Sequence, residues 1–167
     1  MTTPINNGSS LILSSTGDNM PKIGLGTWKL LPSSCATTVY EAIKSGYRLL
    51  DCACDYGNEN AVGIGLSKAI KEGIVTRKEM FITSKLWCTF MDPRHVQEAC
   101  TRSCLDLQCD YLNLYLIHFP ITLQYVNPSV RYPPGWMYDD HSGIIESKVT
   151  LQSTWEAMEK VHIFEMF

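Results

Sequence analysis

Apolar runs of strand length alternate with segments of helical periodicity along most of the chain. This β-α-β-α-β-α-β-α order predicts a parallel sheet covered by helices. The apolar runs are nearly continuous, which is typical of strands buried on both faces. They span about 21–27, 47–53, 80–87 and 111–119. Apolar residues recur at three- and four-residue spacing over about 33–45, 58–72, 93–107 and from Thr150 onward.

Residues that favour helix ends flank the helical segments. A polar side chain at the N-cap can accept hydrogen bonds from the free N–H groups of the first turn, and glycine commonly follows the last turn. The expected starts are Ser33 or Ser34, Asn58 or Glu59, and the pair Asp92-Pro93, and the expected stops are Gly46 and Gly73. The segment before the first helix predicts a short hairpin turned at 16–19, and residues 120–148 predict a long loop rich in aromatic residues and proline.

Three polar side chains follow the apolar runs at nearly equal intervals. Asp51, Lys85 and His118 each stand at the end of a predicted strand, with 34 residues from the first to the second and 33 from the second to the third. Each interval is one strand–helix unit, so the three residues occupy equivalent positions at the carboxyl ends of strands. Parallel α/β folds place their active sites there. The aromatic residues near the same ends are Trp28, Tyr56, Trp87 and Phe119.

A phenol, an ammonium, a carboxylate and an imidazole can act together on one carbonyl oxygen. Lys85 would favour the ionised form of the Tyr56 phenol, and Asp51 would hold Lys85 charged and aimed. His118 would hydrogen-bond to the carbonyl oxygen and orient it. Tyr56 would protonate that oxygen, which is general acid catalysis of a reduction. None of these side chains can supply a hydride, so a cofactor must.

Each of these residues also has a simpler explanation. A Lys–Asp pair is often only a structural ion pair, and a single histidine at a strand end is more often a satisfied polar residue. Trp28 and Trp87 can be ordinary core aromatics. Because all four polar groups fall at the ends of consecutive strands, the pattern favours an active site. Periodicity alone does not single out reduction.

Composition and charge argue against several other classes of protein. With a formal net charge of −3, the 167-residue chain gives no reason to expect nucleic acid or an anionic membrane as a partner. Its start lacks the basic and apolar regions of a signal peptide, and no stretch reaches the roughly 18 apolar residues of a membrane span, so we expect an intracellular, cytoplasmic protein. The seven cysteines include no C-x-x-C pair, which predicts reduced thiols and no metal site.

Five short motifs make the chain similar to a known enzyme family. They are GLGTW (24–28), LDCACDYGNE (50–59), SKLW (84–87), LIHFP (116–120) and TWEAMEK (154–160). In this order and spacing they resemble the aldo-keto reductases, and the resemblance runs from about residue 20 to about residue 160. DYGNE and LIHFPI, followed by RYPPG, are most similar to aldose and D-xylose reductases. The resemblance implies a TIM (β/α)8 barrel and the NADPH-dependent reduction of aldehydes or aldoses to alcohols.

The resemblance also implies roles for individual residues. Tyr56 would be the proton donor, Lys85 and Asp51 would promote its ionisation, and His118 would orient the substrate carbonyl. The substrate pocket would be lined by Trp28, Trp87, His118 and Phe119, and the nicotinamide end of the cofactor would lie near Gly26, Thr27 and Asp51.

The chain is shorter than a whole barrel of this type. A (β/α)8 barrel usually needs about 250 residues, and four strand–helix units correspond to its N-terminal half. We therefore expect a capping hairpin in residues 1–19, a partial reductase domain in residues 20–167, and an ending after Lys160 that reflects truncation or alternative splicing. Four strands cannot close, so open strand edges predict low stability and self-association. The alternative hypothesis is a non-catalytic fragment or interaction module that retains the four polar residues.

Overall fold

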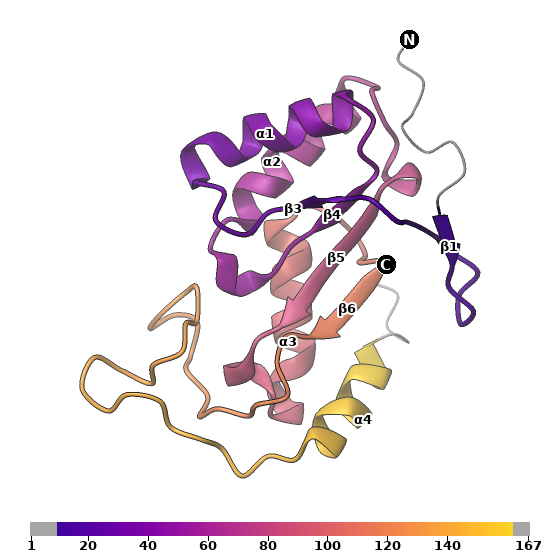
Figure 1. Cartoon of the computed structure of the whole chain (residues 1–167). Coiled ribbons are helices and arrows are strands. Elements are labelled where there is room, and N and C mark those ends of the chain that lie inside the picture. The colour runs from indigo at the N-terminus through magenta and orange to yellow at the C-terminus, as the bar shows by residue number, and fades with distance from the viewer. Residues whose placement is uncertain (1–9, 162–167) are drawn as a thin grey trace.

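A four-stranded parallel sheet forms the centre of the molecule (Figure 1), and the computed structural model describes residues 10–161. The strands lie in sequence order across the sheet and are β3 (Leu25–Gly26), β4 (Leu49–Asp51), β5 (Phe81–Leu86) and β6 (Leu114–Ile117). The α-helices are α1 (Pro32–Lys44), α2 (Glu59–Lys71), α3 (Pro93–Asp106) and α4 (Leu151–Val161). Single turns of 3-10 helix are η1 (Cys54–Tyr56), η2 (Arg77–Glu79) and η3 (Cys88–Phe90). The predicted alternation of strands and helices is confirmed.

A separate antiparallel hairpin precedes the sheet. It consists of β1 (Ser10–Ile12) and β2 (Asn19–Pro21), and Gly17 supplies a positive φ of 78° in its turn. The strand predicted over about 21–27 is present but shorter, as Leu25–Gly26, because β2 ends at Pro21 and the chain bends before it joins the sheet as β3. The hairpin lies beside the amino ends of the sheet strands (Figure 1). Residues 1–9 of the predicted hairpin segment lie outside the described residues.

The start of α1 differs from the prediction. Its N-cap is Leu31 rather than Ser33 or Ser34, and Pro32 occupies the first helical position. Proline fits there because its fixed φ suits a helix and its missing N–H would have had no partner in the first turn. The Ser34 hydroxyl donates to the Leu31 carbonyl at 3.3 Å, so it does not cap the helix.

The other two predicted starts are confirmed in position, but their side chains behave differently. Asn58 is the N-cap of α2, yet its side chain accepts no capping hydrogen bond. Its amide instead donates to the carbonyls of Thr27 (2.8 Å) and Leu30 (3.1 Å), so it ties α2 to the segment after β3. Asp92 caps α3 as predicted, because its carboxylate accepts from the backbone N–H of Arg94 at 3.0 Å.

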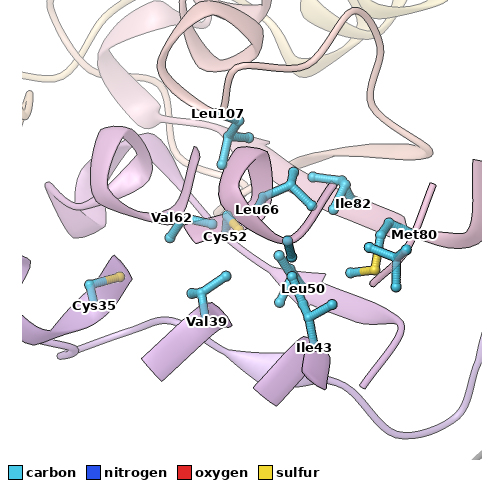
Figure 2. Packing of buried hydrophobic residues seen from close by; sticks show 12 residues of the cluster. Cys35, Val39, Ile43, Leu50, Cys52, Val62, Leu66, Met80, Ile82 and Leu107 are labelled. Atoms are coloured by element: carbon cyan, nitrogen blue, oxygen red, sulfur yellow. The ribbon is translucent and has the colours of Figure 1, made fainter. Parts of the chain in front are cut away.

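The larger part of the core lies between the sheet and the pair α1 and α2. Figure 2 shows this packing, to which Val39, Ile43, Leu50, Leu66 and Ile82 contribute fully buried side chains. Burying one such side chain stabilises the folded state by roughly 1.5–3 kcal/mol. The two helices approach closely at a glycine, Gly65, where an added Cβ would clash with the carbonyl oxygen of Ala36. A second core cluster joins α3 and α4 to the end of β5.

A buried carboxyl group, Glu59, connects three elements behind the sheet. From the first turn of α2 it accepts hydrogen bonds from the hydroxyls of Ser84 on β5 (2.5 Å) and Ser103 on α3 (2.9 Å). Its side chain is only 3% exposed. Burial raises the pKa of Glu59 to about 7, although the two serine hydroxyls oppose this rise.

A long segment without regular secondary structure connects β6 to α4. We call residues 120–148 the strap, and Figure 1 shows it looping out beyond the carboxyl ends of β5 and β6. Its two ends are joined by an isolated bridge between Leu123 and Glu146 and by hydrogen bonds from the Thr122 hydroxyl to the carbonyls of Ser147 and Val149. The predicted loop is therefore confirmed, and it is closed at its base. Within residues 10–161 no helix has both the length and the apolar character that crossing a membrane requires.

Candidate active site

The strands bring three of the expected polar residues to one face of the sheet. Side chains alternate between the two faces of a strand. Leu50 and Ile82 face the helices and are buried in the core, so Asp51 and Lys85 face the opposite side. The side chain of His118 follows β6 on that same side, and its backbone N–H continues the ladder to the Leu86 carbonyl at 3.0 Å. The strand-end spacing seen in the sequence thus produces a true cluster.

Lys85 is the centre of this cluster. Its ammonium donates to the Asp51 carboxylate at 2.6 Å, the Cys52 carbonyl at 2.9 Å and the Tyr56 hydroxyl at 3.1 Å. An ammonium has three protons, so these contacts use all of them. Burial by itself would lower the pKa of Lys85, but the hydrogen bonds that its ammonium donates to Asp51 and Tyr56 outweigh burial, and the pKa is raised. Lys85 therefore stays charged and cannot rotate freely.

Tyr56 projects its phenol into the same space. It is the last residue of η1, and the turn ends at Gly57, whose φ of 69° is the left-handed conformation that glycine adopts most readily. Because its oxygen accepts from Lys85, the phenolic proton remains available for a second partner. The ring contacts His118 edge to face, with centroids 5.7 Å apart, and lies 6.5 Å from the ring of Trp28.

His118 is held as a neutral imidazole beside this phenol. Burial and the positive charge of Lys85 lower the pKa of His118, and the charge of Asp51 only partly opposes them. Its ring stacks on Phe119 at 4.7 Å and meets Trp87 edge to face at 5.0 Å. Nδ1 is buried and has no hydrogen-bond partner within residues 10–161. A neutral imidazole carries one N–H, which can be donated to an oxygen near Tyr56.

The expected residues on β3 lie at the edge of the cluster. Gly26 is opposite Asp51 in the ladder, and no atom lies within 4 Å of the place where its Cβ would be. Thr27 is fully buried, and its hydroxyl donates to the Asp51 carbonyl at 3.1 Å, so this group joins β3 to β4. Trp28 is 64% exposed, with the Lys29 ammonium 4.4 Å above its ring. It flanks Tyr56 and is not a core residue.

An aromatic side chain from the strap packs against the aromatic residues of the site. Trp87 is 1% exposed, and its indole N–H donates to the Gly135 carbonyl of the strap at 2.8 Å. The next residue, Trp136, packs against Trp87 with ring centroids 4.7 Å apart and against Phe119 at 5.3 Å. Sequence reasoning identified Trp87 and Phe119 but missed Trp136. The only sequence signal for Trp136 was its place in an aromatic loop.

The arrangement fits chemistry on one polar oxygen. A fixed cation, a phenol with a free proton and a neutral imidazole lie together beside aromatic rings, and such groups can orient and protonate a developing alkoxide. Within the part of the chain that the structure describes, no three His, Cys, Asp or Glu side chains are grouped as a metal site. All seven cysteines are free, and six of them are buried.

Comparison with known proteins gives consistent results. D-xylose reductases described as NAD(P)H-dependent are 54% identical over 147 residues in Hypocrea jecorina and 55% identical over 146 residues in Pyricularia oryzae. Each comparison covers 87% of this chain and 45% of the relative. The aldose reductase of Schistosoma japonicum superposes with a TM-score of 0.83 at 37% identity, over 95% of this chain and 50% of that one. An aldo-keto reductase of Bombyx mori in complex with NADP gives a TM-score of 0.78 at 30% identity, over 98% and 48%.

These coverages have a direct structural meaning. The chain spans about half the length of the curated relatives it matches, and its four strand–helix units correspond to half of a barrel of this type. The expected fold class is therefore confirmed. The family model described as "Aldo/keto reductase family" matches residues 22–162, which include every strand of the parallel sheet, and the chain therefore belongs to the aldo/keto reductase family.

Proposed function

We propose that this chain provides the catalytic centre of an NADPH-dependent carbonyl reductase, which converts aldehydes or aldoses to alcohols with Tyr56 as proton donor. The observation that carries the proposal is the position of the Lys85 ammonium, 2.6 Å from Asp51 and 3.1 Å from the Tyr56 hydroxyl. A cation held by a carboxylate on one side and a phenol on the other stabilises the phenolate that remains when the proton leaves.

The proposed reaction is a two-electron reduction. When bound, NADPH would supply the hydride that the carbonyl carbon accepts. Tyr56 would give its phenolic proton to the carbonyl oxygen, so that the product would be an alcohol. His118 donates its N–H to the same oxygen and holds the carbonyl in line with Tyr56. Lys85 keeps the phenolate stable until a proton from solvent restores the phenol. Asp51 keeps Lys85 in place throughout.

The residues beside Asp51 fit the nicotinamide end of such a cofactor. Open space next to Gly26 leaves room for a flat ring at the end of β3. The carboxylate of Asp51 is 46% exposed even though it pairs with Lys85, so it can still accept a hydrogen bond from an amide. Thr27 is fully buried and its hydroxyl is engaged by Asp51, so we assign it the role of fixing this edge. The names of the fungal relatives and the NADP complex of the Bombyx mori protein support this cofactor.

The pocket walls favour a small carbonyl compound that has both apolar and polar parts. Trp28 and Phe119 are exposed beside Tyr56 and His118, and the buried Trp87 packs against His118. Aromatic faces pack against C–H groups, while the imidazole and phenol hydrogen-bond to oxygen. The relatives named D-xylose reductases support an aldose as the substrate.

The test is a titration with NADPH followed by a turnover assay. NADPH bound beside Trp28 and Trp87 should quench tryptophan emission, and an aldose or aliphatic aldehyde should then be reduced as NADPH absorbance falls. Tyr56→Phe should keep the quenching and lose turnover by about 10²–10⁴-fold, which is the usual contribution of a general acid. Turnover that Tyr56→Phe does not reduce would contradict the role of Tyr56.

A second candidate is a non-catalytic fragment or interaction module. The observation that favours it is the length of the chain, which spans 45% of its D-xylose reductase relatives. In this case the Lys85–Asp51 pair is inherited but does not act. Absence of NADPH quenching up to millimolar concentrations would favour this second candidate over the enzyme.

The organisation of the chain leads to a proposal about assembly. We assign the segment 1–19 to an N-terminal cap and the segment 20–167 to a partial reductase domain; of these, residues 1–9 and 162–167 lie outside the described residues. Within residues 10–161, β3 and β6 are each paired on one side only, and unpaired strand edges tend to associate. Self-association through these edges should appear as concentration-dependent mass in analytical ultracentrifugation, and a monomer at all concentrations would contradict it.

The proposed setting is the cytoplasm. A formal net charge of −3 gives no reason to expect nucleic acid or anionic lipid as a partner, so the proposed partners are the cofactor and a small carbonyl compound. Cell fractionation with an antibody against the chain tests this, and recovery in a membrane pellet would contradict it.

A further inference from the structure

The two residues that flank Tyr56, Asp55 and Gly57, both contact the strap. Asp55 Oδ1 accepts a hydrogen bond of 2.8 Å from the backbone N–H of Gly135, 80 residues further along the chain. On the other side, the position that a Cβ on Gly57 would occupy is 3.1 Å from the Pro133 side chain, so the absence of a side chain lets the strap approach. The turn that positions Tyr56 therefore also contacts the strap.

The backbone N–H and the backbone carbonyl of Gly135 both form hydrogen bonds with side chains near the site. Its N–H is bound by Asp55, and its carbonyl is bound by the indole N–H of Trp87 at 2.8 Å. Backbone groups in an exposed loop often form hydrogen bonds with water. At Gly135 two side chains take this role, so they hold the strap at this point. Gly135 itself has a φ of 63°, a left-handed conformation that glycine permits without strain.

The two hydrogen bonds at Gly135 fix the direction of the next side chain, that of Trp136. Trp136 lies against Trp87 at 4.7 Å and Phe119 at 5.3 Å. Within the strap, the guanidinium of Arg131 donates to the carbonyl of Pro134 at 2.7 Å and to that of Met137, so it braces the chain on both sides of Trp136. The turn is therefore rigid and would move as a unit if its anchor to Asp55 were lost.

The chemistry of Asp55 suits an anchor. Burial raises the pKa of Asp55, while the hydrogen bond from Gly135 and the charge of Arg131 oppose the rise. Contact with the strap therefore favours the carboxylate. A hydrogen bond to a charged acceptor is about twice as strong as one between neutral groups. No contact joins Asp55 to Lys85 or to the Tyr56 hydroxyl among the hydrogen bonds of residues 10–161.

We propose that Asp55 is a positioning residue that holds the strap against the site through Gly135 and so makes Trp136 a wall of the substrate pocket. The assignment of Trp136 to a substrate pocket rests on the proposed function, but the anchoring of the strap by Asp55 does not depend on turnover. Asp55 acts through Gly135 and does not touch the reacting atoms. Its effect is to exclude water and to limit the width of the space next to Tyr56.

The test compares three variants of the full chain. Asp55→Ala removes the acceptor, Asp55→Asn keeps an oxygen that can accept from Gly135, and Asp139→Ala is the matched control. Asp139 lies in the same strap, and among residues 10–161 the hydrogen bonds that it accepts come from His141 and Ser142 of its own turn. The readouts are trypsin cleavage after Arg131 and the circular-dichroism couplet expected from the Trp87–Trp136 pair, which Trp136→Phe identifies.

Asp55→Ala should be cleaved after Arg131 about tenfold faster than the wild type, which corresponds to the loss of one charge-assisted hydrogen bond of about 1.4 kcal/mol. It should also lose the couplet. Asp55→Asn should restore most of both signals, and Asp139→Ala should keep the couplet. If Asp55→Ala does not fold, Asp55→Glu replaces it, because the longer side chain moves the carboxylate away from the Gly135 N–H. Asp55→Glu should then show the same faster cleavage and the same loss of the couplet.

Wild-type cleavage rates and an intact couplet in folded Asp55→Ala would overturn the inference, as would equal losses in Asp55→Ala and Asp139→Ala. These readouts require neither cofactor nor substrate. Failure to bind NADPH, together with a couplet that depends on Asp55, would overturn the proposed function and leave the positioning role of Asp55 standing.

Discussion

Replacing Glu59 with glutamine should remove most of the pH dependence of folding stability between about pH 4.5 and pH 7. Burial raises the pKa of Glu59 from its ordinary 4.5 to about 7 in the folded chain. The folded state therefore holds a proton that the unfolded state releases in this range. The stabilisation from the neutral carboxyl is complete below about pH 4.5 and is lost as the pH rises through about 7.

The magnitude follows from the pKa difference. One pKa unit corresponds to about 1.4 kcal/mol, so ionisation of Glu59 should cost the folded chain about 3 kcal/mol by neutral pH. Since the side chain is only 3% exposed, solvent does not screen this cost appreciably. Glutamine is neutral at every pH and can still hydrogen-bond to the hydroxyls of Ser84 and Ser103. Glu59→Gln should therefore match the wild type at about pH 4.5 and exceed it by about 3 kcal/mol at about pH 8.

The assay is urea unfolding of the wild type and Glu59→Gln at several pH values across this range. Glu41→Gln is the matched control, because Glu41 is exposed on α1 and only approaches Lys44 at 4.0 Å. An exposed substitution of this kind normally changes stability by less than about 0.5 kcal/mol. Parallel pH profiles for the wild type and Glu59→Gln would refute the reasoning, since they would mean that Glu59 does not titrate abnormally in the folded chain.

Three other substitutions test the packing and the site. Lys85→Met should lower carbonyl reduction by about 10²–10⁴-fold, because it removes the cation beside Tyr56, while NADPH quenching persists; steady-state kinetics and the fluorescence titration check this, and undiminished turnover would contradict it. Leu66→Ala should destabilise the chain by about 2–5 kcal/mol in urea, since it leaves a cavity between α2 and the sheet, and a loss below about 1 kcal/mol would indicate a poorly packed core. Gly65→Ala should destabilise by about 1–3 kcal/mol, although alanine normally favours a helix, because the added methyl group meets the Ala36 carbonyl; a rise in melting temperature would show that α1 and α2 can separate freely.

Some local features were predictable because their physical causes are local. Asp92 caps α3 as expected, since a carboxylate followed by proline suits a first turn in almost any surroundings. The start of α1 was not predictable in the same way. Ser33 and Ser34 are suitable N-cap residues, and Pro32 suits the first helical position. In the folded chain the helix begins at Pro32, with Leu31 as its N-cap. Asn58 was placed correctly, but its amide binds carbonyls at the end of β3 that only the folded chain brings near.

The sequence by itself determined the order of strands and helices and the convergence of the polar residues. Strand periodicity and one strand–helix unit per interval place Asp51, Lys85 and His118 at equivalent ends and on the same face, whatever the details of packing. Tyr56 lies close to Asp51 in the sequence, at the end of the turn η1 that follows β4. These features repeat along the chain, so a pattern of residue types is sufficient to specify them.

Only the tertiary structure decided the contacts between segments with no common period. The bond from Asp55 to Gly135 spans 80 residues, and it depends on how an irregular strap returns over the sheet. The high pKa of Glu59 likewise depends on burial by elements from three parts of the chain. Hydrophobic periodicity encodes which face of an element is buried, but it carries no information about which distant polar groups meet, because hydrogen bonds and desolvation act only at the short distances that folding creates.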